Sequence, residues 1–474
     1  MKGKRIAFSF WLLALFCLVF GLLFGMAGSL QYVFTGMLKE QFSFAKMRPL
    51  HVFLITQWIS CAAIGGMYYF IPSVRNKGLF SPLLAKLHLF INIFIVMVAV
   101  SDFLNGKFTG REYMEFPLWI VALMISGWIL AGINLLATVK PSYNTAPVYI
   151  WSWSTGILFF IITLTEASLW QFDHFNANII RDITVQWKAM GSMVGAWNQL
   201  IYGSAMFLMC RISGSDKIAR SKEAFFFYFL GMANLMFNWG HHTYVVPASP
   251  AIKMTAYIIS MTELLILFNM IWKWLKTLNQ EDKELHQSWR LLKMTDNWIL
   301  LNLFLAIAIS VPALNMYTHG THITVAHAMG ATIGINTTIL LACALYIYFQ
   351  ERRSALPHMS KTFRRSLTVF NVSLLVFWIS LVGMGIVKAA AVQQHTVFAE
   401  IMHKLQPWFR VFSASGFVLT AAIVVMVAPL IRQFTGSIIR HKPESASQRK
   451  PLTKVITIAE KEKQEPFSVT SDRS

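Results

Sequence analysis

Residues 11–24 read WLLALFCLVFGLLF and lie inside a longer run, from residue 6 to residue 34, that contains no charged side chain. An α-helix rises about 1.5 Å per residue, so roughly twenty such residues cross the ~30 Å hydrocarbon core of a bilayer. Similar apolar runs recur, about twelve in all, and the others lie near residues 50–72, 84–104, 115–137, 147–170, 190–211, 224–246, 252–275, 296–317, 322–350, 368–390 and 408–434. The runs are continuous and lack the alternation of barrel strands. The sequence therefore predicts an all-α polytopic membrane protein with about twelve transmembrane helices.

The distribution of charge predicts the topology. The net charge is +20, a value that could suggest nucleic-acid binding. With an even number of spans both termini share one side, and roughly thirty of the 41 Lys and Arg residues fall on that side against about eleven opposite. This is the positive-inside pattern, so we expect both termini to be cytoplasmic and no nucleic-acid partner.

One membrane domain is expected over residues 1–436, followed by a cytoplasmic, basic tail at 437–474. The tail is rich in Lys, Glu, Ser and Pro, a composition typical of disorder. The four cysteines are isolated within apolar runs, and no C-x-x-C or C-x-x-C-H motif occurs. Disulfides, zinc knuckles and covalently attached c-type haem are therefore not expected.

Three histidines lie where ionisable groups are costly. His241 and His242 end one apolar run, and His327 lies inside another. Ionisable side chains within membrane segments are usually functional, and neutral imidazole is the commonest protein ligand for transition metals. These residues are therefore candidate metal ligands.

Residues 317–330 read YTHGTHITVAHAMG. This segment resembles the tenth-helix signature of haem-copper oxidase catalytic subunits, in particular the nitric oxide reductase branch, which reads T-H-G-T-x-x-T-x-A-H-x-H. The resemblance implies that His327 is the proximal ligand of a high-spin catalytic haem. Met329 stands where the family has the second histidine, a ligand of a low-spin haem. Residues two apart on a helix point about 200° apart, so one helix can serve two haems.

Four other segments match the same family in the same order. RPLH at 48–51 implies that His51 is the other low-spin haem ligand, and GREYME at 110–115 implies that Glu112 binds a structural calcium ion. GHH at 240–242 implies that His241 and His242 bind the non-haem metal. SMTE at 260–263 places Glu263 where the reductases carry a buried glutamate. His319 and His322 match variable positions, where contacts to haem propionates or water are expected.

The sixth helix departs from the family pattern. The family carries a third metal-ligating histidine there, followed four residues later by a glutamate in the reductases, whereas residues 195–203 read GAWNQLIYG. Alignment on the last glycine puts Asn198 in the ligand position and Tyr202 in the glutamate position, and a slip of one residue would put Trp197 there. A site with two histidines could hold copper, hold iron or be empty.

The resemblance implies a membrane oxidoreductase with two b-type haems and a copper or non-haem iron ion. We expect it to reduce nitric oxide to nitrous oxide in a bacterial inner membrane, with a c-type cytochrome subunit or a quinol as electron donor. Oxygen-reducing C-type enzymes carry a tyrosine six residues before the histidine pair, where this chain has Leu235, so nitric oxide is favoured over oxygen. The alternatives are a nitric oxide dismutase, an oxygen-reducing variant, a non-catalytic haem-binding gas sensor or assembly homologue, and, last, a secondary transporter. Structural roles also stay open for single residues, such as packing for Met329 and hydrogen bonding for Glu263.

Overall fold

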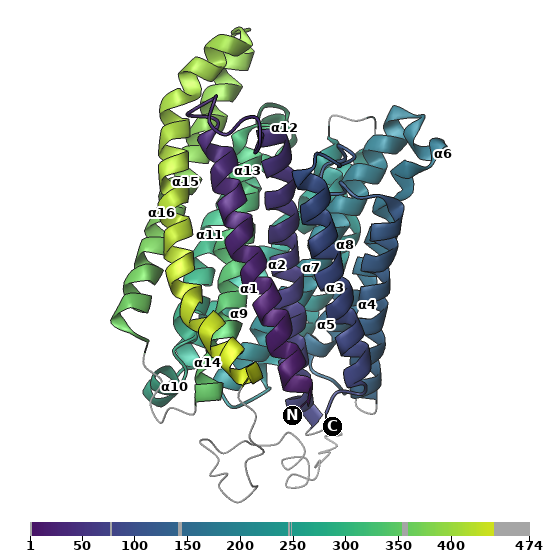
Figure 1. The fold of residues 1–474 in the computed structure, drawn as a ribbon, viewed down its shortest axis with the longest axis vertical. Coiled ribbons are helices and arrows are strands. Elements are labelled where there is room, and N and C mark those ends of the chain that lie inside the picture. The colour runs from purple at the N-terminus through teal and green to yellow at the C-terminus, as the bar shows by residue number, and fades with distance from the viewer. Residues whose placement is uncertain are drawn as a thin grey trace, which may run out of the picture.

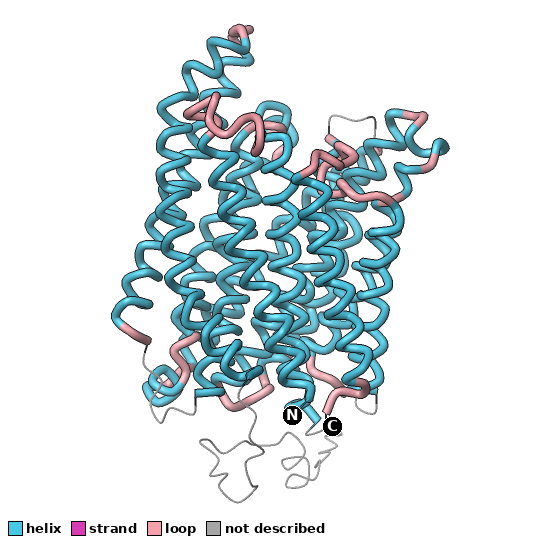
Figure 2. Tube along the Cα trace, in the orientation of Figure 1, coloured by secondary structure: helices cyan, strands magenta, loops and turns pink. Residues whose placement is uncertain are grey.

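The structure, a computed structural model, is a bundle of long helices that run side by side (Figure 1). It describes residues 2–75, 78–140, 145–244, 247, 249–352 and 359–439. Figure 2 shows only helices and connecting loops over this part of the chain. The all-α prediction is confirmed. In the predicted tail, which covers residues 437–474, residues 440–474 lie outside the described part.

The long helices follow one another with short connections. They are α1 (Lys2–Leu30), α2 (Phe44–Arg75), α3 (Pro82–Leu104), α4 (Leu118–Val139), α5 (Val148–Ala167), α7 (Ile179–Ile212), α8 (Lys222–Phe237), α9 (Pro250–Thr277), α11 (Trp289–Ser310), α14 (Thr338–Arg352), α15 (Lys361–Gln393) and α16 (Phe398–Ile439). Shorter elements connect them: η2 (Leu169–Gln171), α6 (Asp173–Asn176), η3 (Ile218–Arg220), η4 (Asn238–Thr243), α10 (Gln280–Leu285), α12 (Pro312–Thr318), α13 (His322–Met329) and η5 (Gly330–Thr337).

Within the described part, ten helices are long and apolar enough to cross a membrane. One of these spans, His322–Arg352, is made of α13, η5 and α14 in continuous succession. Two further helices occupy the remaining predicted runs. Of these, α7 has 34 residues but includes charged positions, and α8 has 16 residues and continues into η4. The predicted runs thus correspond to helices, and two of them are less apolar or shorter than a typical span.

The first and last helices meet at one end of the bundle. The rings of Phe8 on α1 and Phe434 on α16 stack with centroids 5.5 Å apart. Lys4 near the start of α1 forms an ion pair with Glu351 at the end of α14, with 2.8 Å between Nζ and Oε1. Figure 1 shows the start of α1 and the end of α16 at the same end. The two ends of the helical bundle's chain therefore lie on the same side of the bundle.

Local sequence explains where several helices start. Ser81, Asn178, Ser221 and Ser360 each accept a hydrogen bond from a backbone N–H of the first turn of α3, α7, α8 and α15. Such caps satisfy donors that have no partner within the helix. Thr321 caps α13 in the same way, so the helix that carries His327 and Met329 begins at His322.

Candidate functional site

The histidine pair lies on a tight turn of helix after α8. His241 and His242 belong to η4, a six-residue 3₁₀ segment, and their ring centroids are 4.1 Å apart. Gly240 lets η4 pack directly on α9, because a Cβ there would lie 2.9 Å from Cβ of Ala256. The glycine of the GHH motif therefore sets the depth at which the two imidazoles enter the bundle.

Two further rings surround His242. The indole of Trp187 on α7 stacks on it, with centroids 4.7 Å apart and planes 10° from parallel. The imidazole of His319, at the end of α12, lies 6.0 Å from His242 and 5.8 Å from Trp187 between centroids. The structure thus brings together residues from α7, η4 and the α12–α13 connection.

His327 completes this group of histidines. It lies on α13, within electrostatic range of both His241 and His242, and His319 is within the same range of the pair. The Nδ1 atoms of His242 and His327 are buried and have no hydrogen-bond partner in the described part of the chain. Buried polar atoms are nearly always paired, so two unpaired imidazole nitrogens in one region are candidates to bind a ligand.

The helix changes its winding directly after His327 and Met329. Residues Gly330–Thr337 form a π-helix, η5, which presses closely on its neighbours. A Cβ on Gly330 would lie 2.5 Å from Oδ1 of Asn302 on α11. At the far end of η5, Trp58 Nε1 on α2 donates to Thr337 Oγ1 over 3.1 Å. Such π segments are frequent at functional sites, and this one fixes α13 against α2 and α11.

His51 has the hydrogen bonding of a metal-ligating histidine. Its Nδ1 lies 2.8 Å from the carbonyl oxygen of Gly21 on α1, and a carbonyl can only accept. In the neutral ring Nε2 therefore carries the lone pair. Gly25 makes room for this ring, because a Cβ there would lie 2.4 Å from Nδ1. A backbone carbonyl that orients the second ring nitrogen is the usual support for a ligating imidazole.

Met329 lies on the opposite side of α13 from the histidine pair. It packs against a cluster built mainly from α15 and α16, which includes Leu381, Met384 and Phe409. Tyr32, just after α1, stacks on Phe409 with centroids 4.7 Å apart. One helix therefore presents His327 to η4 and Met329 to α15 and α16, as the spacing of two residues predicts.

The three residues predicted as catalytic lie away from the histidine pair. Glu263 on α9 is buried and accepts a hydrogen bond from Nδ2 of Asn234. Asn234 lies on α8, seven positions before His241 in the sequence. Tyr202 on α7 is buried within electrostatic range of Glu263. Asn198 Oδ1 accepts a hydrogen bond of 3.3 Å from Asn336 of η5. Seven helical residues span about 10 Å, so Glu263 and Tyr202 form a separate buried polar group about two turns from the pair.

Gln199 joins this group. A Cβ on Gly231 would lie 2.4 Å from Nε2 of Gln199 and 3.1 Å from Oε1 of Glu263, so both side chains flank the same glycine. The sequence pattern singled out neither Gln199 nor Asn234. Polar residues inside α7 and α8 were the only available signal.

Glu112 lies in the loop between α3 and α4, where Nη2 of Arg48 donates to its carboxylate. Nearby, Glu115 Oε2 accepts from the N–H of Gly110 over 2.7 Å. Burial raises the pKa of Glu115, and the bond from Gly110 opposes that shift. Calcium usually takes six to eight oxygen ligands. An arginine already pairs with Glu112, and among the described residues no group of three His, Cys, Asp or Glu side chains that could hold a metal ion includes it, so calcium binding by Glu112 stays a prediction.

The transition-metal site of the family is also incomplete in this chain. Over the described residues, no three His, Cys, Asp or Glu side chains are arranged to hold a metal ion. The part of α7 that faces the histidines offers Trp187 and Gly191, and a Cβ on Gly191 would lie 2.7 Å from Cβ of Trp239. Asn198, the residue expected to replace the missing histidine, lies 11 positions after Trp187 on α7. The residues therefore fit haem ligands at His51 and His327, but they do not reproduce the three-ligand metal site.

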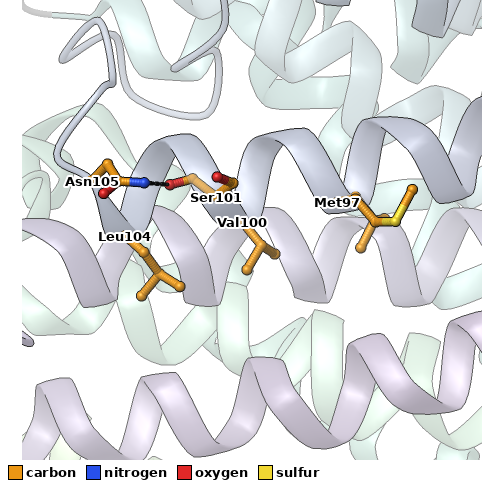
Figure 3. A pocket seen from close by; sticks show the side chains of 6 residues that line it. Met97, Val100, Ser101, Leu104 and Asn105 are labelled. Carbon is orange, nitrogen blue, oxygen red and sulfur yellow. Dashed lines mark hydrogen bonds between the residues drawn. The ribbon is translucent and has the colours of Figure 1, made fainter.

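An open surface pocket on α3 carries none of these residues. It is lined by Val96, Met97, Val100, Ser101, Leu104 and Asn105 (Figure 3). Within it, Asn105 Nδ2 donates to the carbonyl of Ser101 over 2.8 Å. The lining offers no titratable group, so the histidine cluster is the better candidate for chemistry.

Comparison with known proteins identifies the family of the chain. The family described as "Cytochrome C and Quinol oxidase polypeptide I" matches residues 5–418. The chain belongs to this family of haem-copper oxidase subunits. It is also 23% identical over 373 residues to a subunit of the nitric oxide reductase of Stutzerimonas stutzeri, covering 73% of this chain and 75% of that protein.

The fold of the haem-copper oxidase family is found as well. A solved structure of a haem-copper terminal oxidase dimer matches with a TM-score of 0.69 at 12% identity, covering 97% of this chain and 90% of that chain. The all-α, haem-copper oxidase-like bundle predicted from the sequence is therefore confirmed. Membership of the family makes this chain a multi-pass membrane protein of an oxidoreductase superfamily.

Proposed function

We propose that this chain is the catalytic subunit of a membrane enzyme that reduces nitric oxide to nitrous oxide. Two nitric oxide molecules, two protons and two electrons give one nitrous oxide and one water. The identity to part of a nitric oxide reductase supports this choice of substrate. So does Leu235, which stands at the place of the tyrosine in C-type oxygen reductases and packs against Gly195 of α7.

The observation that carries the proposal is the placement of His327. Its unpaired Nδ1 lies in a buried region beside η4, and the same helix presents Met329 to the other side. His327 would hold a high-spin haem, and His51 and Met329 would hold a low-spin haem. When bound, these groups would supply electron transfer and a binding site for the gas. A methionine in place of a second histidine raises the potential of such a haem.

The side chains around the site would manage water and protons. Trp187 stacks on His242 and covers one face of the pair, which excludes solvent from that side. Glu263 on α9 is a buried carboxylate that accepts a hydrogen bond from Asn234 of α8, and Gln199 flanks the same glycine, Gly231. We assign to Glu263 the role of holding a proton for the reaction, and Tyr202 lies beside it. Buried intramembrane carboxylates commonly serve such a role.

The setting follows from the charge distribution. We propose a bacterial inner membrane with both termini in the cytoplasm, where the larger share of Lys and Arg would lie. The donor would be a c-type cytochrome subunit or a quinol, since no motif for covalent haem occurs in the chain.

The test is nitric oxide consumption by the purified protein in detergent, with a chemical electron donor and a nitric oxide electrode. We expect turnover to nitrous oxide, and its loss in His327→Ala. His403→Ala, a change at an exposed histidine on α16, is the matched control and should keep activity. Oxygen consumption with no nitric oxide consumption would contradict the substrate assignment.

A haem-binding gas sensor without turnover is the second candidate. The incomplete metal site favours it, since no three-ligand group occurs among the described residues. A sensor would bind haem and nitric oxide stoichiometrically and release no nitrous oxide. The same electrode measurement, with gas chromatography of the headspace, separates the two functions.

A further inference from the structure

A small pocket lies where α2 starts and α3 ends, at the end of the bundle opposite the start of α1. We call it the α2–α3 pocket, and its lining includes Arg48 and Phe53 of α2, Phe103 of α3, and Glu112, Glu115 and Phe116 of the following loop.

Three buried phenylalanines give the α2–α3 pocket an aromatic lining. The ring centroids of Phe53 and Phe116 are 5.3 Å apart, and those of Phe103 and Phe116 are 5.4 Å apart. The faces of aromatic rings carry negative electrostatic potential and attract cations such as an ammonium group. The apolar part of the lining therefore suits a small cation better than an anion.

The charged side chains of the pocket carry one positive and two negative charges. Arg48 donates to the carboxylate of Glu112, and the two side chains are 46% and 43% exposed. Glu115 is buried within electrostatic range of both, and it takes part in no ion pair within the described part of the chain. One guanidinium thus serves two carboxylates, and a second positive charge would balance the pocket.

The loop that carries the two carboxylates is anchored to α7. Nη1 of Arg111 donates to both carboxylate oxygens of Asp182, over 2.7 and 2.9 Å. Nε2 of Gln186 donates to the backbone carbonyl of Glu112 over 3.0 Å. These contacts hold the backbone of the loop, so the pocket is formed before a ligand enters.

The pocket lies at the height of the lipid headgroups. The helix α2 has 32 residues, more than the about twenty that cross the hydrocarbon core, so its first turns extend into the polar layer of the bilayer. On α3 the open surface pocket presents apolar side chains such as Met97, Val100 and Leu104 (Figure 3). Leu104 follows Phe103 directly, so both pockets reach the same turn of α3.

We propose that the α2–α3 pocket binds the headgroup of a phospholipid that carries a primary ammonium group, of the phosphatidylethanolamine type. The ammonium group would donate to Glu112 and Glu115 against the phenyl rings, and the phosphate would accept from Arg48. An acyl chain would lie on the apolar face of α3. A primary ammonium has three N–H donors for the two carboxylates, whereas the trimethylammonium of phosphatidylcholine has none.

The experiment is native mass spectrometry of the delipidated full chain in detergent. Phosphatidylethanolamine, phosphatidylcholine and phosphatidylglycerol with identical acyl chains are added in turn. Because hydrogen bonds between charged groups are the strong ones, we expect phosphatidylethanolamine to bind at least about tenfold more tightly than either other lipid.

Two variants separate the parts of the headgroup. Glu115→Gln keeps an oxygen that can accept from the N–H of Gly110, so the loop is kept while the charge is lost. It should remove the preference for phosphatidylethanolamine over phosphatidylcholine. Arg48→Gln should weaken both lipids, because both carry the phosphate. Glu40→Gln, at an exposed position of the loop before α2, is the matched control and should bind as wild type does.

Three results would overturn the assignment. They are equal binding of phosphatidylethanolamine and phosphatidylcholine by wild type, an unchanged preference in Glu115→Gln, and the same loss of preference in Glu40→Gln. Calcium ions added to the wild type test the other occupant predicted for Glu112. Displacement of phosphatidylethanolamine by calcium at an equal concentration would also overturn the assignment, in favour of a metal site.

Discussion

The indole of Trp187 stacks on the imidazole of His242, with ring centroids 4.7 Å apart and planes 10° from parallel. This contact identifies the stretch of α7 that faces the histidine pair. An indole at this position offers no metal ligand, so the chain has two of the expected imidazoles without the third ligand that the family pattern places on this helix.

Replacing Trp187 by histidine should add a ligand. The new imidazole would start from a position already in contact with His242, so Trp187→His should complete a three-histidine site with His241 and His242. We expect at least about tenfold more non-haem metal per chain than in wild type, measured by elemental analysis after dialysis against EDTA. Trp197→His, on the same helix but more than two turns away, is the control and should behave as wild type. Equal metal retention in both variants would show that α7 does not face the metal at position 187.

Removing His327 should remove the haem that it binds. His327→Ala leaves no side-chain nitrogen at this place on α13, so we expect the high-spin haem signal to disappear from the optical spectrum and the haem content to halve. The low-spin signal should persist, because His51 and Met329 lie on other surfaces. A spectrum identical to that of wild type would contradict the ligand assignment.

Neutralising Glu263 should impair turnover but not cofactor binding. In Glu263→Gln the side-chain oxygen still accepts the hydrogen bond from Asn234, so the fold is kept while the ionisable proton is lost. Loss of a proton-transferring group typically costs 10²–10⁴-fold, and we expect nitric oxide turnover to fall about 10²-fold. Haem content and the optical spectrum should not change. Full activity in Glu263→Gln would rule out the proton role, and loss of haem would point to a structural one.

The carboxyl group of Glu115 should make stability depend on pH. Burial raises its pKa in the folded protein, so the folded state binds the proton more tightly than the unfolded state. This group therefore favours folding at pH values below its unfolded pKa, and its contribution declines as the pH rises from about 4.3 toward the folded pKa. Glu115→Gln should flatten that decline in melting temperature, measured by tryptophan fluorescence between pH 4.5 and 7.5.

Glu40→Gln, a change in an exposed loop, is the control for that measurement. It should keep the slope of wild type. If Glu115→Gln also keeps that slope, then the environment assigned to Glu115 is wrong.

The membrane fold could be predicted because lipid imposes it on local sequence. A helix is the simplest way to satisfy the backbone in a bilayer, so each apolar run predicts one. The start of α7 was not predictable in this way. The run begins near residue 190, but the helix begins at Ile179, where Asn178 caps it and Arg111 pairs with Asp182 at 2.7 Å between Nη1 and Oδ1. These contacts join distant parts of the chain.

Two residues near the histidine pair, Trp187 and His319, were not predicted as ligands of the site. Trp187 lies before the apolar run and is not a ligand type, so no pattern selected it. His319 lies near His242 only because of the turn between α12 and α13. In contrast, His241, His242, His327 and His51 were predicted as ligands from short motifs whose spacing is set within single helical segments.

The most direct test of the account is the haem content of the purified chain, measured by the pyridine haemochrome against total protein. Ligation by His51 and Met329 and by His327 predicts two b-type haems per chain, one low-spin and one high-spin. A chain that purifies folded and without haem would contradict the assignment of these residues and the redox function proposed from them.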